Sequence, residues 1–277
     1  MKRMVATKYR DTGRPSKART LLEVWFANMS AYRAEIVIWM LTGSIPLIML
    51  AVWIGKAQAA GGAVGDFTPQ RFAAYFLAAW VSQQLVVAWV AWELDLQIRQ
   101  GILSAKLLRP LDPLWEHLAM HVTERLVRVP LAIIVIVVGL FIVPGTQLTP
   151  DLPHALLYLL SINLAFLIRF LIAYCVGILA FWFEQAIAVE ELYYSIAMFL
   201  TGSFAPLDLY PVWARTIIEW LPFPYVIYYP VQILTGEANG LEIVRIIAVQ
   251  LAWITIFGVL RSLLWRRGLR RYGAVGA

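Results

Sequence analysis

The chain has 277 residues, of which 61% are apolar and only 14% are charged, whereas soluble proteins carry roughly a quarter charged residues. This composition, with a mean hydropathy of +0.72, excludes an ordinary soluble protein and indicates one that crosses a membrane. The net charge of +6 does not indicate nucleic acid as a partner. The basic residues flank apolar runs, so membrane lipids with anionic headgroups are the expected partners.

Six apolar stretches are long enough to be membrane helices, because a hydrocarbon core of about 30 Å needs some 20 helical residues. In chain order they are residues 36–54, 72–92, 126–143, a span within 155–183, 188–204 and 243–260. The first is too long for a secretory signal core, so it is expected to remain in the protein. Arg128, near the start of the third, is expected to snorkel toward the interface.

The basic residues show which side of the membrane each end occupies. Of 23 Lys and Arg residues, 18 fall in residues 1–35, 93–128 and 261–277. Positive charge is retained on the cytoplasmic side, so both termini and the loop 93–125 are predicted to be cytoplasmic. The predicted fold is all-α and polytopic, with a six-span domain over 36–260 between the cytoplasmic segments 1–35 and 261–277.

Residues 20–35 precede the first span and show helical periodicity. Leu21, Trp25, Met29 and Tyr32 follow one another at a spacing of three or four residues. This pattern predicts an amphipathic helix on the inner membrane surface. The alternative is an inward extension of the first span.

The loop 93–125 is predicted to be the most structured cytoplasmic region. Gly101 inside its helical pattern costs about 1 kcal/mol relative to Ala, which favours a break there. Pro110 and Pro113 disfavour helical backbone at the residues before them, and Asp112 can cap a new helix that begins at Pro113. The result is a short helix with a stiff turn, suited to passing force to a cytoplasmic partner. The alternative is a hairpin that packs only on its own chain.

Residues 202–239 contain five prolines but are rich in aromatic residues. They are too apolar for a solvated loop and too broken to span, so short external helices that re-enter the outer leaflet are predicted. Such backbone is tolerated at depth only when it is buried in protein or lines a cavity. Arg215 and Glu219, four residues apart, are expected to pair.

The sequence contains little that indicates an enzyme or a metal site. The chain has no Gly-x-x-x-x-Gly-Lys-Ser/Thr phosphate loop and no nucleophile elbow, so it is expected to be neither an ATPase nor another enzyme. His117 and His121 lie four residues apart beside Glu116 and Glu124, a spacing that can serve a metal. The local order differs from that of metalloproteases, so we interpret them as solvated or interfacial histidines and expect no metal.

Arg169 is the charge that lies well inside a predicted span. Intramembrane charges are costly and usually face a cavity or a partner, so Arg169 is expected to contact an anionic substrate group or an acidic residue on another helix. Snorkelling or structural pairing is the alternative. Asn163, six residues earlier, extends the same polar stripe only loosely, and Tyr193 completes the candidate substrate path.

Three strings suggest a family when taken in order: Ala31-Tyr32-Arg33-Ala34-Glu35, the run 107–114 that reads LLRPLDPL, and Leu221-Pro222-Phe223-Pro224-Tyr225. With the six spans and the broken external segment, they resemble ABC-2 type exporter permeases over nearly the whole chain. The likeness is to a bacterial subgroup of mostly unassigned substrate, related to daunorubicin-resistance-type exporters.

The resemblance implies a permease subunit of the bacterial inner membrane that exports a hydrophobic, lipid-like or amphipathic substrate. It implies a second permease chain, identical or related, and separate ATPase subunits that hold ATP and magnesium, with no cofactor bound by this chain. The ATPase subunits would dock on the helix 20–35 and on the first cytoplasmic loop. The docking candidates are Trp25, Arg33, Ile98, Gly101, Ile102, Leu103, Lys106, Leu107, Arg109, Pro110 and Asp112.

Two other classes stay open from the residues alone. An ion-gradient-driven carrier or channel needs paired charges inside the membrane, for which Arg169 and the adjacent Glu190 and Glu191 are the candidates. A scaffold subunit that transports nothing fits the composition equally well.

Overall fold

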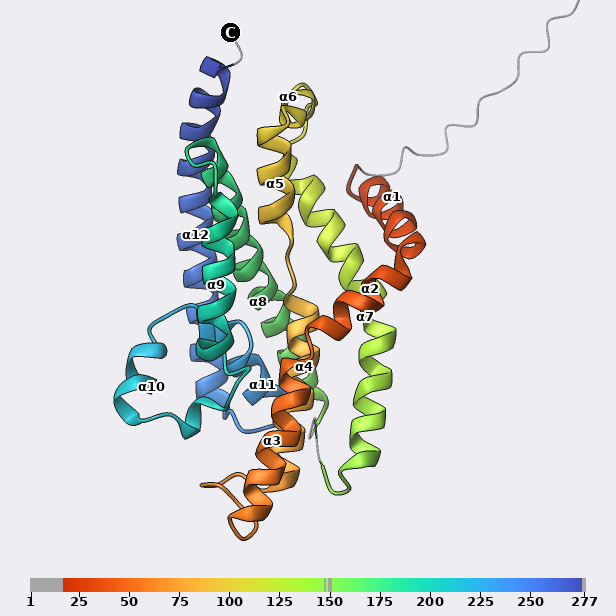
Figure 1. Ribbon diagram of the computed structural model, residues 1–277, viewed down its shortest axis with the longest axis vertical. Helices are drawn as coiled ribbons and strands as arrows, with labels where there is room; N and C mark the ends of the chain where they lie inside the picture. Colours follow the sequence, from red (N-terminus) through yellow and green to blue (C-terminus); the bar gives the residue numbers. More distant parts are fainter. Residues whose placement is uncertain (1–16, 147, 149–150, 276–277) are drawn as a thin grey trace, which may run out of the picture.

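The computed structural model describes residues 17–146, 148 and 151–275, leaving the side chains of 17, 18, 33, 42 and 273–275 outside the description, and over this part of the chain it is all-α with no strand. Figure 1 shows the arrangement. The α-helices are α1 Lys17–Ala31, α2 Arg33–Thr42, α3 Ile45–Ala59, α4 Pro69–Val86, α5 Val90–Arg99, α6 Ile102–Leu107, α7 Pro113–Ile142, α8 Leu152–Ile178, α9 Ala186–Leu200, α10 Val212–Ile218, α11 Tyr228–Leu234 and α12 Gly240–Val275. Three short 3₁₀ helices are η1 Leu179–Phe181, η2 Leu207–Leu209 and η3 Phe223–Tyr225.

Within the described residues, five helical stretches are long and apolar enough to cross a membrane. They are Ala34–Ala59, Pro69–Arg99, Pro113–Ile142, Leu152–Phe181 and Gly240–Tyr272. They cover five of the six predicted spans and confirm a polytopic all-α protein. Helix α9, at the predicted fifth span, has 15 residues and a length of about 22 Å, less than the hydrocarbon core. The six-span count therefore stays a prediction.

Two of the spans are broken in ways that the sequence analysis did not predict. The first is interrupted between α2 and α3, where Gly43 and Ser44 are followed by Pro46 in the first turn of the new helix. Proline suits that position because its missing N–H has no helical partner there. The second is interrupted at 87–89, between α4 and α5, although this segment contains neither glycine nor proline.

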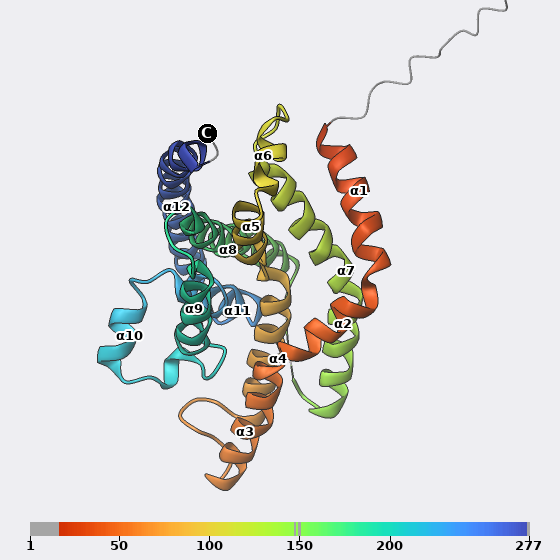
Figure 2. The same ribbon diagram turned by 45° about the horizontal axis from the view of Figure 1, so that its top comes forward.

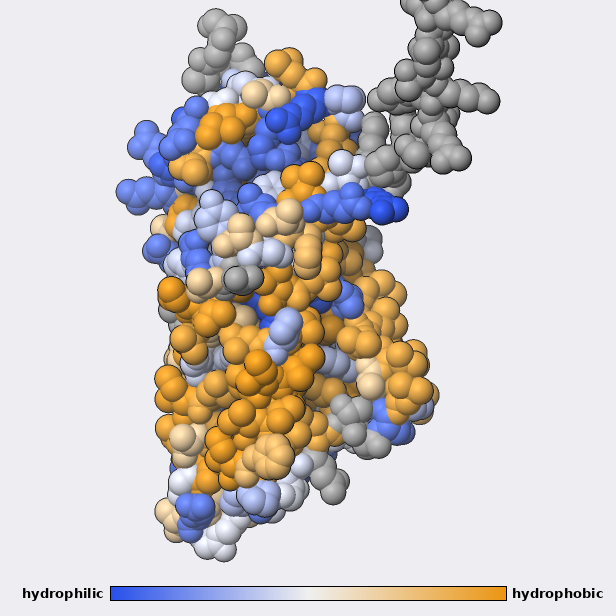
Figure 3. Space-filling view, turned by 90° about the vertical axis from the view of Figure 1, so that its right-hand side faces the viewer, coloured by the Kyte–Doolittle hydropathy of each residue, from blue (hydrophilic) through white to orange (hydrophobic). Residues whose placement is uncertain are grey.

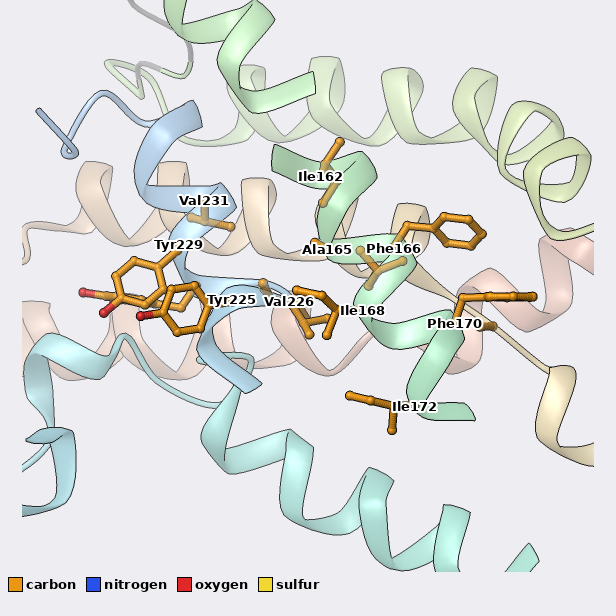
Figure 4. Close-up of a cluster of buried hydrophobic side chains, with 14 of the residues drawn as sticks. Ile162, Ala165, Phe166, Ile168, Phe170, Ile172, Tyr225, Val226, Tyr229 and Val231 are labelled. Atoms are coloured by element: carbon orange, nitrogen blue, oxygen red, sulfur yellow. The ribbon is translucent and has the colours of Figure 1, made fainter. Parts of the chain in front are cut away.

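Helix α8 is the centre of the packing and contacts α4, α5, α11 and α12. Figure 4 shows Ile168 of α8 beside Val226, in the segment that carries η3 and α11, whereas the rings of Phe166 and Phe170 point to the other side of α8. Phe166, Phe170 and Tyr174 follow at four-residue spacing, with neighbouring ring centroids 5.9 and 5.8 Å apart. In the most apolar part of the span that contains α8, 72% of the stretch is buried inside the protein. The corresponding share is 17% or 18% for the spans that contain α3, α7 and α12. The latter three helices therefore leave apolar surface for lipid or a partner chain.

The described parts of the three basic stretches lie at one end of the molecule. Figures 1 and 2 show α1, α6 and the C-terminal part of α12 together at that end. Figure 3 shows hydrophilic residues gathered there, above a broad apolar band. Which side of the membrane this end faces stays a prediction.

The segment 202–239 is broken into short helices, and α11 within it is buried against α8 and α4. Asp208 holds the segment together by accepting hydrogen bonds from Tyr228 Oη at 2.9 Å and Gln232 Nε2 at 3.2 Å. Arg215 pairs with Glu219 at 2.9 Å, which confirms the expected pair. Within this segment α11 is enclosed by protein, whereas in and just after α10 Trp213 is 71% and Trp220 80% exposed; the predicted re-entry into the outer leaflet stays a prediction.

Candidate functional site

A compact turn joins α5 to α7 at the basic end, and we call residues 100–114 the elbow. Near its start, Gly101 has a φ of +73°, a left-handed conformation that favours glycine. The predicted break at this residue is confirmed. Near its end, Asp112 Oδ1 accepts from the backbone N–H of Leu114 at 2.9 Å. The predicted cap, with Pro113 opening the next helix, is also confirmed.

Polar contacts fix the elbow to two long helices. Asp112 Oδ1 accepts a second hydrogen bond, at 2.6 Å, from Arg261 on α12. Lys106 Nζ lies 2.9 Å from Glu116 on α7, and Ser104 Oγ lies 2.9 Å from the hydroxyl of Tyr272 on α12. The elbow is therefore held between α7 and α12, and a push on it reaches both helices.

The outer face of the elbow is apolar with a basic margin. Leu107 is 37% exposed and Leu108 88% exposed, and the side chain of Arg109 is 65% exposed. The sequence analysis missed Leu108, which follows the last residue of α6 and so falls outside a helical-face count. It also missed Trp115, which is 55% exposed in the first turn of α7. The signal that could have identified this exposed part of the elbow is the apolar pair Leu107 and Leu108, which lies close to Pro110 in a basic loop.

The other docking candidates in this region divide between surface and interior. Ile102 and Pro110 are exposed, whereas Ile98 and Leu103 are buried and face the bundle. In this structure the two buried residues support the elbow from inside. They offer no surface to a partner.

The predicted helix 20–35 is divided into α1 and the start of α2. Helix α1 packs beside α7 (Figure 2). Trp25 is half-buried, while Phe26 is exposed. Tyr32 lies between the two helices and is 56% exposed. Arg33 begins α2, and its side chain lies outside the described part. The place of α1 on the membrane surface stays a prediction.

Arg169 lies on α8 and is paired with Glu190 on α9, and both side chains are buried. Its guanidinium carbon also lies 4.5 Å from the ring centroid of Tyr193 and 4.8 Å from that of Tyr194. Glu190 is thus the acidic residue on another helix that the sequence analysis expected. The arginine does not snorkel.

A cavity of about 330 Å³ adjoins this pair, and we call it the α8–α9 cavity. Its lining comes from α3, α4, α8, α9 and the turns that follow α4, α9 and η3, and includes Arg169 and Tyr193. Arg169 Nη1 and Glu190 Oε2 are buried without a hydrogen-bond partner among the described residues. Asn163 is absent from the lining; its Oδ1 accepts instead from Arg125 Nη1 on α7 at 3.1 Å. Two of the three candidate substrate-path residues are therefore brought together here.

The interpretation of His117 and His121 as solvated or interfacial is wrong, because their side chains are buried. His121 Nε2 accepts from the backbone N–H of Trp89 at 2.7 Å, and its Nδ1 lies 2.7 Å from the carbonyl oxygen of His117. A nitrogen that accepts carries no proton, so Nδ1 is the donor. The histidine thus satisfies an N–H left free by the break between α4 and α5. No group of three potential metal ligands occurs in the described residues.

The expected snorkelling of Arg128 is also wrong. Its side chain is buried and donates from Nε to Glu124 at 3.1 Å and from Nη1 to Gln84 at 2.8 Å. Trp89 Nε1 donates to the same glutamate at 3.2 Å. Because these partners lie within the helix bundle, the guanidinium of Arg128 forms its hydrogen bonds there and does not extend toward the membrane interface.

The family model described as ABC-2 family transporter protein matches residues 45–276. This range contains the elbow, the α8–α9 cavity and the packing around α8, whereas α1 and α2 precede it. No curated protein sequence matches the chain. Because the matched range covers most of the chain, the protein belongs to the ABC-2 transporter family, as a membrane-embedded permease component that works with ABC ATPase subunits.

Proposed function

We propose that this permease exports a hydrophobic, lipid-like or amphipathic substrate across the bacterial inner membrane, and that separate ATPase subunits drive it through the elbow. The observation that carries the proposal is the elbow itself, an exposed apolar tip on a braced turn. Leu107 and Leu108 offer a contact surface, and Arg109 adds charge at its margin. Apolar residues with arginine are typical of protein interfaces.

Force would pass from the ATPase subunits to the helices through the contacts of the elbow. ATP and magnesium bind on the ATPase subunits, whose closure displaces the elbow. Asp112 joins the start of α7 to Arg261 of α12, so both helices move with it. Packed helices move as units because interiors are close-packed and transmit strain.

A second permease chain, identical or related, would complete the pathway. The spans of α3, α7 and α12 bury little of their surface within this chain, which leaves apolar faces for a partner or for lipid. The α8–α9 cavity is the proposed path within one chain. Glu190 compensates the charge of Arg169, so the cavity suits an apolar molecule with a hydrogen-bond acceptor for the free Nη1.

The test is association of the purified chain with its ABC ATPase subunits. Leu108→Glu places a charge at the contact and is expected to weaken co-purification at least about tenfold, because an unpaired charge at a buried contact costs several kcal/mol. Leu241→Glu is the matched control, since Leu241 is 86% exposed and begins α12 at the far end. Equal recovery of ATPase subunits with both variants would contradict docking on the elbow.

A further inference from the structure

A second hollow, of about 600 Å³, lies between α2, α5 and α7, outside the α8–α9 cavity. Its walls include Tyr32 and three tryptophans, Trp39, Trp89 and Trp92, and it also holds the carboxylates of Glu35 and Glu93. We call it the tryptophan groove. The proposed export mechanism uses none of these six residues.

The tryptophan rings are tilted against each other. The centroids of Trp39 and Trp89 are 5.3 Å apart with their planes at 59°, and those of Trp89 and Trp92 are 5.7 Å apart at 52°. Trp89 occupies the break between α4 and α5, which is why it lies beside Trp92 and Trp39. Trp39 is 47% exposed, so this cluster of aromatic rings is in contact with the space of the groove.

Two carboxylates of the groove lack a strong counter-charge. Glu93 lies 3.1 Å from His117 Nδ1, and Glu35 lies 3.5 Å from Trp39 Nε1. Among the described side chains neither pairs with Lys or Arg, whereas Glu124 at the back of the groove is neutralised by Arg128. Charge beside apolar walls is unfavourable unless it is compensated, so the two carboxylates favour a positively charged ligand.

We propose that the tryptophan groove binds an apolar organic cation, such as a quaternary ammonium or phosphonium ion. The faces of aromatic rings carry negative potential and attract such cations, with tryptophan the strongest. The two carboxylates supply the matching charge, and the volume admits an apolar body. The ammonium headgroup of a phospholipid has the same chemistry and is the second possible source of the ligand.

The position of the groove connects it to transport, and in this role the inference rests on the proposed function. Trp92 lies 5.8 Å from Tyr194 between ring centroids, and Tyr194 lines the α8–α9 cavity. A row of aromatic rings therefore leads from the groove to the cavity. A cation held in the groove would lie beside the proposed path, and a substrate that carries both a cationic group and a hydrogen-bond acceptor could contact the two sites in turn.

The test uses the full chain in nanodiscs of phosphatidylglycerol, with labelled tetraphenylphosphonium as the probe and empty nanodiscs subtracted. Saturable binding is expected. Glu35→Gln combined with Glu93→Gln should weaken it at least about tenfold, and Trp39→Leu about two- to thirtyfold. Trp39→Phe keeps a ring face and should recover part of the loss. Trp213→Leu, on exposed α10, is the matched control and should bind as wild type.

A second arm replaces half of the lipid with phosphatidylethanolamine. A lower apparent affinity identifies the lipid ammonium as a competing occupant, and an unchanged affinity identifies the free cation; either result retains the cation site. Binding that does not saturate, or that survives the double glutamine change in a protein that melts as wild type, would overturn it. No ATPase subunit is present, so this result is independent of the Leu108→Glu test.

Discussion

The ion pair of Arg169 and Glu190 is the residue-scale feature that joins α9 to α8. The two side chains are 4% and 0% exposed, and taking two charges out of water is costly unless their attraction and hydrogen bonds compensate. The rings of Tyr193 and Tyr194 cover the guanidinium. Sequence reasoning identified the arginine because it is isolated within an apolar run. It named Glu190 and Glu191 together as candidates for a paired charge and did not choose between them, because the turn 179–185 decides which face of α9 meets α8.

Breaking this pair is expected to destabilise the fold. Glu190→Gln leaves a buried guanidinium without a counter-charge and should lower the free energy of unfolding by about 3–5 kcal/mol. The double change Arg169→Met with Glu190→Leu should recover most of that loss, since it removes both charges. Thermal unfolding in detergent measures the effect, and Glu191→Gln, on the exposed neighbour, is the control. Wild-type melting of Glu190→Gln would show that the pair does not support the fold.

At the scale of elements, local chemistry decides which breaks could be predicted. The break at Gly101 and the start of α7 at Pro113 were predicted because glycine and proline dictate backbone conformation directly. The break at 87–89 was not, because its free N–H is satisfied by His121, 32 residues away along the chain. The same long-range contact explains why the two histidines are buried. A sequence pattern gives no information about such a partner.

The packing of α5 on α8 depends on a close approach at Gly177. A Cβ at this residue would lie 3.1 Å from Ala91 Cα and 3.0 Å from Leu94 Cβ, and backbone atoms cannot move aside cheaply. Gly177→Val is therefore expected to lower the free energy of unfolding by about 1–3 kcal/mol.

The matched control is Gly258→Val, because a Cβ at Gly258 meets nothing within 4 Å. Denaturant unfolding of both variants in the same detergent gives the comparison. Equal stability of the two would contradict the close approach of α5 and α8.

For the whole molecule, composition and charge distribution were sufficient to predict the class. The apolar runs predicted a polytopic all-α protein, and the order of its motifs predicted the ABC-2 family, which the family match confirms. The described parts of three basic stretches far apart in sequence share one end (Figure 1). The tryptophan groove could not be predicted, because it needs the breaks near Tyr32 and Trp89 to bring α2, α5 and α7 together.

The most direct test of the account is ATP-driven accumulation of an amphiphilic probe in inside-out vesicles that contain the chain and its ABC ATPase subunits. Accumulation is expected to require ATP, and Leu107→Ala should lower accumulation while ATP hydrolysis continues, because Leu107 lies on the exposed face of the elbow. The chain without ATPase subunits should accumulate nothing. Accumulation by the chain alone under an ion gradient, or wild-type coupling in Leu107→Ala, would contradict the account.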